Sequence, residues 1–173
     1  MLSLKELSEW LKQFNISHTV TDSQCYDLYK AACNCKEGVI VELGCGHGKS
    51  TLSLGLGANV TVYSVDAFIV PGCRDIFEAN IVKAGFTGKV VSIHAMTNVA
   101  AKTFTLPIGL MFIDADHSYS SVKIDFENWY SKIMVGGLMI MHDYTKPHPG
   151  LIGYVDEIAF PKDIINQMVY IHF

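Results

Sequence analysis

The segment from Val39 to Ser50 constrains the fold of this chain more than any other. It reads Val-Ile-Val-Glu-Leu-Gly-Cys-Gly-His-Gly-Lys-Ser, an apolar run that ends near an acidic residue and breaks into three alternating glycines. Glycine lets a backbone turn sharply and approach a ligand where a side chain would collide. The next apolar run, Val60–Val65, is followed at once by Asp66. The pattern predicts a strand, a glycine-rich turn, a helix and a second strand that ends in a carboxylate.

Such a turn predicts a nucleotide-type cofactor site at the carboxyl edge of a parallel sheet. A helix that opens at Lys49 would offer unpaired N–H groups and a partial positive charge to an anionic group. Asp66 is placed to accept hydrogen bonds from ribose hydroxyls. A glycine-rich turn that serves packing alone is the simpler alternative.

The glycine spacing discriminates among cofactors. A phosphate-binding loop follows G-x-x-x-x-G-K-[ST], and Gly48-Lys49-Ser50 fits its end, but Gly44 makes the loop one residue short. A dinucleotide fingerprint follows G-x-G-x-x-G and needs glycine where Lys49 stands. The pattern that matches is E-x-G-x-G-x-G, which runs from Glu42 to Gly48.

This string closely resembles the first motif of class I S-adenosylmethionine-dependent methyltransferases. The resemblance implies that the loop lies against the methionine part of the cofactor and that Asp66 holds the ribose. It also implies that the Ala95-Met96 segment lines the adenine pocket. The cofactor contacts expected on these grounds are Glu42, Gly44, Gly46, Gly48, Ser50, Asp66, Met96 and Asp114.

Composition favours a single folded domain spanning residues 1–173. The sequence patterns divide it into N-terminal helices in 1–35 and a cofactor-binding α/β core in 36–173. Half of the residues (50%) are hydrophobic and 17% are charged. A net charge of −4 without a run of Lys or Arg disfavours nucleic acid as a partner. Short apolar runs and the lack of a signal-peptide core predict a cytoplasmic protein that does not enter membranes. Its five cysteines are therefore expected to be reduced thiols.

Hydrophobic periodicity predicts alternating helices and strands. This order favours an α/β fold, a Rossmann-like, doubly wound and mostly parallel sheet of six or seven strands with helices on both faces. Class I methyltransferases have seven strands, the last antiparallel and inserted between the fifth and sixth, so the end of this chain departs from the family pattern. The predicted helices span 3–14, 22–33, 49–57, 73–84, 96–102, 118–132 and 150–159, and the six predicted strands span 39–43, 60–65, 90–94, 110–114, 138–142 and 168–173.

A second informative block combines carboxylates and histidines. Asp114 and Asp143 stand at the carboxyl ends of what should be neighbouring strands, with His117 and His142 beside them. Oxygen and imidazole ligands at such an edge can bind one divalent metal and leave positions open for a substrate. The sequence therefore predicts a metal site built from Asp114, His142 and Asp143.

Two strings in this block look like a branch of small-molecule O-methyltransferases that includes macrocin O-methyltransferase. They are D-x-D-H-S-Y from Asp114 and G-G-x-x-x-x-H-D-Y from Gly136. The resemblance implies methyl transfer to the hydroxyl of a small molecule, with His117 and Asp114 as catalytic residues and His117 as the candidate general base. In metal-dependent members an acidic pair after the fifth strand helps to hold Mg²⁺, whereas this chain has His142-Asp143 there.

Several alternatives stay open. In one alternative, Asp114 serves only as a hydrogen-bond acceptor. In another, His117 caps a helix that begins near Ser118. Asp125 is expected on a solvated helix surface. Two other functions remain, a nucleotide (ATP)-dependent enzyme that uses Gly48-Lys49-Ser50 and a non-catalytic interaction module, and homo-oligomerisation is also open. Three neighbouring aromatic residues are expected in the core: Phe126, Trp129 and Tyr130.

Overall fold

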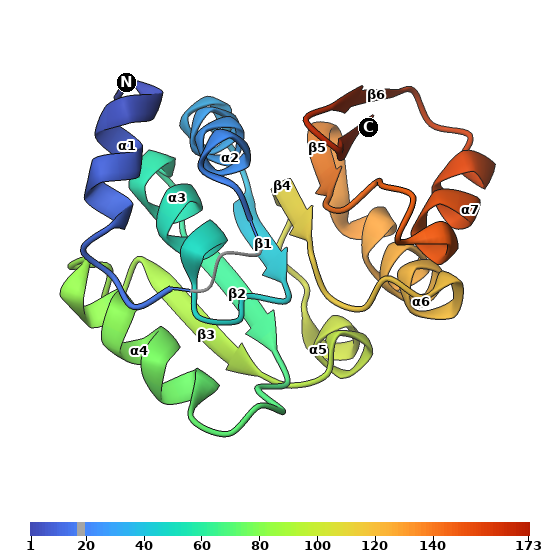
Figure 1. Ribbon diagram of the computed structural model, residues 1–173. Coiled ribbons are helices and arrows are strands. Elements are labelled where there is room, and N and C mark those ends of the chain that lie inside the picture. Colours follow the sequence, from blue (N-terminus) through green and yellow to red (C-terminus); the bar gives the residue numbers. More distant parts are fainter. Residues whose placement is uncertain (17–19) are drawn as a thin grey trace.

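A seven-stranded sheet forms the centre of the molecule (Figure 1). The structure, a computed structural model, describes residues 1–16 and 20–173. The strands lie in the order β3-β2-β1-β4-β5-β7-β6, and all neighbouring pairs from β3 to β5 are parallel. The predicted doubly wound α/β sheet is therefore confirmed. Its strands are β1 (Val39–Leu43), β2 (Val62–Asp66), β3 (Val90–His94), β4 (Ile108–Ile113), β5 (Ile133–Met141), β6 (Lys162–Ile165) and β7 (Met168–His172).

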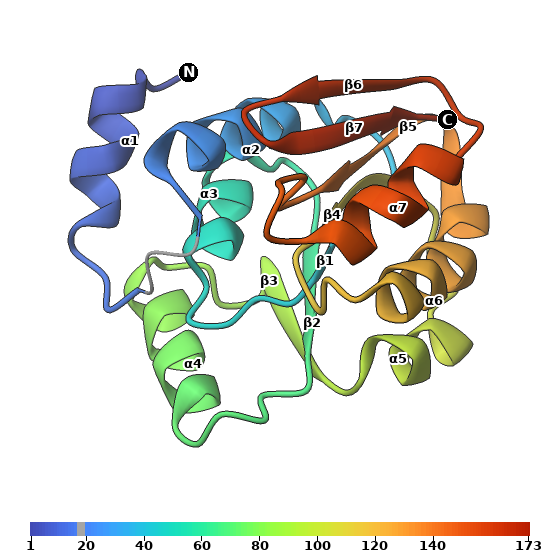
Figure 2. The same ribbon diagram turned by 45° about the vertical axis from the view of Figure 1, so that its right-hand side comes forward.

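Helices cover both faces of this sheet (Figures 1 and 2). Successive strand residues point to opposite faces, so Ile40 belongs to one hydrophobic cluster and Val41 to the other. The first cluster takes side chains from the four N-terminal helices, and the second takes them from the three that follow. The helices are α1 (Leu4–Leu11), α2 (Asp22–Asn34), α3 (Lys49–Gly57), α4 (Cys73–Lys83), α5 (Thr97–Thr103), α6 (Tyr119–Trp129) and α7 (Pro149–Glu157).

The C-terminal hairpin corrects the strand count made from the sequence. Residues 162–165 form β6, which the sequence analysis missed, and the predicted last strand is β7. β7 pairs antiparallel with both β5 and β6, so it lies between them. Asn166 (φ 52°) and Gln167 (φ 63°) form the two-residue turn between β6 and β7. Turns with this left-handed backbone usually carry glycine. The turn packs on α2, where the side-chain amide of Gln24 donates to the carbonyl of Asn166 (2.9 Å).

The start of β5 was also predicted wrongly. The fifth strand was predicted over 138–142, but β5 already begins at Ile133 and contains Gly136 and Gly137. The pairing with β4 shifts register between Ile108 and Leu110, and Gly136 has a left-handed φ of 81°. A glycine inside a strand is typical of such an irregularity. No helix in the described part of the chain is long and apolar enough to cross a membrane.

Candidate active site

The glycine loop between β1 and α3 passes against the end of β4. Gly44 has φ +83°, and a Cβ there would lie 2.3 Å from the carbonyl oxygen of Asp114, so only glycine fits. A Cβ at Gly46 would meet nothing within 4 Å among residues 1–16 and 20–173, which leaves space beside that residue in the described structure. Gly48 precedes α3 and contributes no side-chain cap, so the N–H groups of the first turn receive no side-chain acceptor from it.

Asp66, at the end of β2, fixes this loop. Its Oδ2 accepts hydrogen bonds from the backbone N–H groups of Cys45 and Gly46, both at 2.9 Å, and its Oδ1 accepts one from Phe68 (2.7 Å). The carboxylate also lines the cavity described below. Asp66 was predicted only to accept hydrogen bonds from the ribose. The structure shows that the same carboxylate also holds the backbone of the glycine loop.

Glu42 lies beneath the loop, fully buried. Its Oε2 accepts hydrogen bonds from the hydroxyls of Thr51 and Ser64, while Oε1 has no hydrogen-bond partner among the residues that the structure describes. Burial raises the pKa of this carboxyl to about 7, although hydroxyls around it act to lower it. Glu42 does not line the cavity described below, and its hydrogen bonds connect β1 to α3 and β2. Its expected contact with the cofactor stays a prediction.

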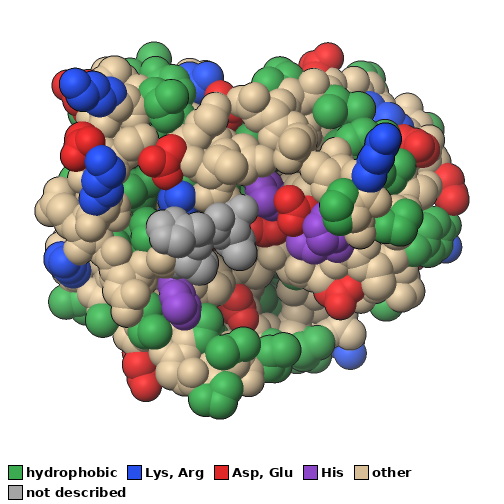
Figure 3. All heavy atoms as spheres, viewed as in Figure 1, with side chains coloured by type: hydrophobic (Ala, Val, Ile, Leu, Met, Phe, Trp, Pro, Cys, Tyr) green, Lys and Arg blue, Asp and Glu red, His purple; other side chains and the backbone are tan. Residues whose placement is uncertain are grey.

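A cavity of about 690 Å³ lies along the carboxyl edge of β1 to β5. This volume is ordinary for a small-molecule or cofactor site. Figure 3 shows histidine and acidic side chains gathered beside a hollow near the middle of one face. Of the residues predicted from the sequence, those that line the cavity are Gly44, Gly46, Ser50, Asp66, Met96, Asp114, His117 and Asp143.

The other predicted residues lie outside the cavity wall. Gly48 packs on α4, where a Cβ would lie 3.0 Å from the ring of Phe77. His142 is 1% exposed, behind the carboxylates of Asp114 and Asp143. Of the segment expected to line the adenine pocket, Met96 lines the cavity together with Thr97 and Asn98, whereas Ala95 packs on the core.

Asp125 is the main residue that the sequence analysis misplaced. It was expected on the helix surface, but it is 3% exposed, lines the cavity and accepts a hydrogen bond from the hydroxyl of Thr97. Burial raises its pKa to about 6. The only sequence signal was helical spacing from Val122, Phe126 and Trp129, which puts Asp125 near the buried stripe. Phe126 and Trp129 are buried as expected, whereas Tyr130 is 38% exposed and does not belong to the core.

Asp114, His117, His142 and Asp143 meet at the ends of β4 and β5. The Nδ1 atom of His142 lies 3.1 Å from Oδ1 of Asp114 and 3.2 Å from Oδ1 of Asp143. The Nε2 atom of His117 lies 3.4 Å from the same oxygen of Asp114. The predicted neighbourhood of these four residues is therefore correct. His148 also lies beside them, with Nε2 3.5 Å from Oδ2 of Asp143.

The imidazoles and carboxylates shift one another's protonation. Burial opposes the charged form of Asp114, but His117 and His142 outweigh it and lower the pKa of that carboxyl. In return, Asp114 raises the pKa of His117 against an opposing effect of burial. Burial acts to lower the pKa of His142, and Asp114 and Asp143 together raise it overall. The cluster thus favours carboxylates beside imidazoles that bind protons readily.

His117 is not the cap of α6. The cap is Ser118, whose hydroxyl accepts a hydrogen bond from the backbone N–H of Ser121, and Asp116 in turn accepts one from the N–H of Ser118 (2.7 Å). The capping alternative for His117 is therefore wrong, and its ring is free to face the cavity that it lines.

Comparison with known families agrees with this geometry. A family model described as a methyltransferase domain matches residues 41–144, from within β1 to the residue after Asp143. The chain belongs to the methyltransferase domain family. The match covers more than half of the 173 residues.

Solved structures share the fold of this methyltransferase domain at low sequence identity. An O-methyltransferase from Bacillus cereus in complex with S-adenosylhomocysteine is 18% identical, with a TM-score of 0.73 and coverage of 97% of this chain and 90% of that one. The S-adenosylhomocysteine-bound methyltransferase PaMTH1 of Podospora anserina is 15% identical, with a TM-score of 0.77 and coverage of 98% and 87%. An rRNA methylase from Streptococcus thermophilus is 15% identical, with a TM-score of 0.68 and coverage of 83% and 92%.

Lys49 distinguishes this methyltransferase domain from a phosphate-binding loop. Its ammonium group donates to the carbonyl of Val20 (2.7 Å) and pairs with Asp22 (2.8 Å), and the residue is 6% exposed. In a phosphate-binding loop this lysine reaches the phosphates. Here the ammonium group of Lys49 is bound to Val20 and Asp22 at the start of α2. This contact weighs against the ATP-dependent alternative.

Proposed function

We propose that this methyltransferase domain transfers a methyl group from S-adenosylmethionine to a hydroxyl group of a small molecule. The observation that carries the proposal is that one cavity contains both the glycine loop with Asp66 and the cluster of Asp114, His117 and Asp143. A cofactor site and a set of proton acceptors in one space are what such a transfer requires.

The cavity suits this cofactor in shape and charge. The open space above Gly46 and the first turn of α3 leave room for a ligand close to the backbone. S-adenosylmethionine carries a positive sulfonium, and the described cavity wall has Lys49 as its one Lys or Arg side chain, already paired with Asp22. Two relatives of the same fold hold S-adenosylhomocysteine, the demethylated product. The aspartates that line the wall are Asp66, Asp114, Asp116, Asp125 and Asp143.

The residues of the chain would act mainly by binding and positioning. S-adenosylmethionine supplies an already reactive methyl group, which passes from sulfur to the acceptor oxygen by in-line displacement. Gly44, Gly46 and Asp66 would hold the donor, with Met96 and Asp125 beside its adenosine part. Holding donor and acceptor in line provides much of the acceleration, because the bimolecular step becomes effectively unimolecular.

His117 would accept the hydroxyl proton at Nε2. This atom is buried and makes no hydrogen bond within the described residues, so its lone pair can accept a proton. Asp114 Oδ1, 3.4 Å away, would stabilise the imidazolium that forms. The proton leaves the acceptor oxygen for His117 as the methyl group arrives, so the products are a methyl ether and S-adenosylhomocysteine.

The predicted Mg²⁺ ion does not fit the residues present. Mg²⁺ takes oxygen ligands in a near-octahedral shell. Asp114, His142 and Asp143 can hold an ion, but one donor is an imidazole, and its Nδ1 already lies within hydrogen-bond distance of Asp114. Mg²⁺ therefore has no part in the proposed reaction, and methyl transfer should persist in the presence of a chelator.

A small acceptor fits the charge of the molecule better than nucleic acid does. The net charge is −4 and the cavity wall is acidic, whereas nucleic-acid-binding proteins present basic surfaces to phosphates. The rRNA methylase with this fold shows that the fold itself does not choose the acceptor. The proposed acceptor is a neutral or cationic small molecule with a hydroxyl group.

The test combines binding with turnover. Calorimetry should detect S-adenosylmethionine and S-adenosylhomocysteine but not ATP, and Asp66→Ala should weaken binding by about 1–3 kcal/mol because charge-assisted hydrogen bonds are lost. Incubation with a panel of hydroxylated compounds should then release S-adenosylhomocysteine. Binding of ATP alone would overturn the proposal in favour of a nucleotide-dependent enzyme. Cofactor binding with no turnover across the panel would favour the interaction module.

A further inference from the structure

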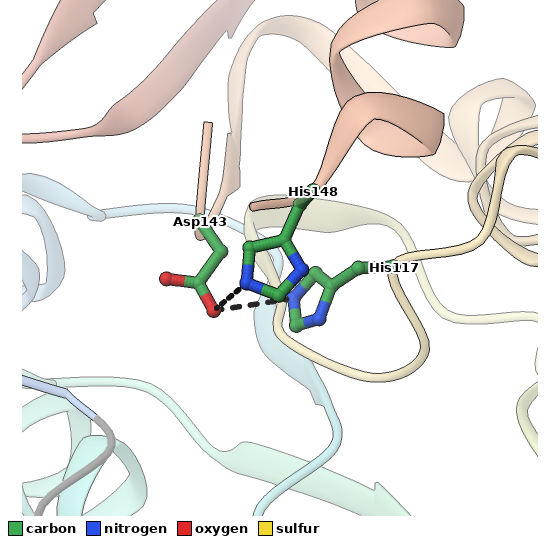
Figure 4. A group of neighbouring side chains, drawn as sticks. All are labelled: His117, Asp143 and His148. Atoms are coloured by element: carbon green, nitrogen blue, oxygen red, sulfur yellow. Dashed lines mark ion pairs between the residues drawn. The ribbon is translucent and has the colours of Figure 1, made fainter. Parts of the chain in front are cut away.

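Two histidines and an aspartate meet at the edge of the cavity, which His117 and Asp143 line, without hydrogen-bonding one another (Figure 4). Oδ2 of Asp143 lies 3.7 Å from Nε2 of His117 and 3.5 Å from Nε2 of His148. The two imidazole rings are 4.5 Å apart between centroids. We propose that these three side chains form a binding site for a divalent transition-metal ion such as Zn²⁺.

The backbone brings the three residues together from distant parts of the chain. Asp143 follows β5 with a left-handed φ of 60°, a conformation that aspartate tolerates better than most residues. His148 precedes α7, and its backbone N–H donates to the carbonyl of Thr145 (2.9 Å). α7 then approaches the turn that carries His117, because a Cβ at Gly150 would lie 2.4 Å from the N of Tyr119 and 2.9 Å from the carbonyl of His117. Gly150 thus permits the contact that places His148 beside His117.

The separations match those between the ligands of one small ion. Metal–ligand bonds of about 2.0–2.2 Å to Zn²⁺ in tetrahedral geometry place ligand atoms roughly 3.3–3.5 Å apart. The two observed nitrogen–oxygen separations, 3.5 and 3.7 Å, need only small side-chain movements to reach that range. All three donor atoms lie within 4.8 Å of one another.

The donor set favours a transition metal over Mg²⁺ or Ca²⁺. Two imidazoles and one carboxylate suit Zn²⁺, Fe²⁺ and similar ions, whereas Mg²⁺ and Ca²⁺ prefer an all-oxygen shell. The three side chains are 20%, 29% and 33% exposed, so an ion can enter and positions remain for water or another ligand. His142 supports the arrangement, because its Nδ1 lies 3.2 Å from the other oxygen of Asp143 and orients the carboxylate.

Ion binding would also regulate the proposed reaction. A metal ion bound to Nε2 of His117 occupies the lone pair that would take the proton from the substrate hydroxyl. Zn²⁺ should therefore inhibit methyl transfer. This consequence rests on the proposed function, whereas the metal site itself does not. Metal binding is therefore measured on the protein without acceptor or cofactor.

The deciding experiment is calorimetric titration of the metal-free protein with Zn²⁺ and, separately, with Mg²⁺. Native protein should bind one Zn²⁺ and bind it at least tenfold more tightly than Mg²⁺. His148→Ala and Asp143→Asn should each weaken Zn²⁺ binding by roughly tenfold or more, the size typical of a disturbed metal shell. Asparagine at 143 keeps the left-handed backbone while removing the charge. His148→Ala should leave the affinity for S-adenosylhomocysteine unchanged, because His148 does not line the cavity.

Two matched variants control for binding elsewhere. His172→Ala removes an exposed histidine that also pairs with an aspartate, Asp163, on the terminal hairpin. Cys33→Ser removes a partly exposed thiol. Both should bind Zn²⁺ as the native protein does. Native affinity in His148→Ala, or tighter binding of Mg²⁺ than of Zn²⁺, would overturn the site even if the methyl transfer is demonstrated. Failure to bind S-adenosylhomocysteine would count only against the proposed function.

Discussion

The ionisable side chains of this protein differ in pKa because their immediate surroundings differ. Glu42 and Asp125 are both carboxyls with raised pKa values, and burial is the main cause in each. Asp114 is almost as buried, yet two imidazoles lower its pKa. Residue type alone therefore says little about which carboxylate is charged in the cavity.

Replacement of His117 tests the proposed base. His117→Asn should lower turnover by roughly a hundredfold or more, because asparagine cannot accept the proton. The melting temperature and cofactor affinity should stay close to native, since Ser118 and not His117 caps α6. Release of S-adenosylhomocysteine is the measurement, and a stable variant with native turnover would exclude His117 as the base.

Glu42 predicts a pH dependence of stability. Its folded pKa is about 7 against an ordinary 4.5, so between these values the unfolded chain loses a proton that the folded chain keeps. The free energy of unfolding should therefore fall as pH rises through this window, by roughly 3 kcal/mol at most. Glu42→Gln keeps an acceptor for Thr51 and Ser64 and should remove this fall. Denaturant unfolding of both proteins across the window decides, and parallel pH profiles would contradict the raised pKa.

Loops and helix ends position the site at the scale of secondary structure. The glycine loop runs close to the end of β4, and α7 runs close to the start of α6, in each case at a glycine without room for a side chain. Asp66 bonds the glycine loop to the end of β2. These contacts connect elements that are close in space and separated in the sequence.

Gly44→Ala should show how much the close approach at the glycine loop matters. Gly88 is a matched control, because it has nearly the same φ (+82° against +83°) but no described atom within 4 Å of an added Cβ. Gly88→Ala should cost about 1–2 kcal/mol for left-handed backbone alone. Gly44→Ala should cost clearly more and also weaken cofactor binding, because its Cβ would collide with the carbonyl of Asp114. Equal losses of unfolding free energy in the two variants would refute the argument from crowding.

Charge is distributed over the molecule in a way that favours a cationic ligand. The net charge is −4, and aspartates surround the cavity at the ends of several strands. A cleft with one sign of charge raises the local concentration of ligands with the opposite sign. Salt screens such an attraction.

The affinity for S-adenosylmethionine should accordingly depend on ionic strength. Its sulfonium charge is absent from S-adenosylhomocysteine, so added salt should weaken binding of the methylated cofactor more than binding of the demethylated one. Calorimetry of both ligands at low and high salt measures the difference. Identical salt dependence would show that the acidic wall does not contribute to recognition of the sulfonium.

Much of the fold could be predicted from local patterns. Periodicity identified α2, α3 and β3 almost to the residue, because a helix or strand with one buried face repeats at its own period. The hairpin strand β6 was missed, because its short run lies at the sheet edge with three of its four residues exposed and its turn lacks the usual glycine. Single-domain organisation, cytoplasmic location, the oligomeric state and the cofactor roles of individual residues stay predictions.

The sequence by itself determined the glycine loop, the acidic ends of β1 and β2, and the grouping of Asp114, His117, His142 and Asp143, since each follows from where a strand ends. Only the tertiary structure decided which side chains reach the cavity. Asp125 is buried because its helix packs on α5, where Thr97 donates to it. His148 lies beside His117 because Gly150 lets α7 approach the start of α6. Contacts of this kind depend on packing between elements that are distant in the sequence, so local sequence patterns cannot predict them.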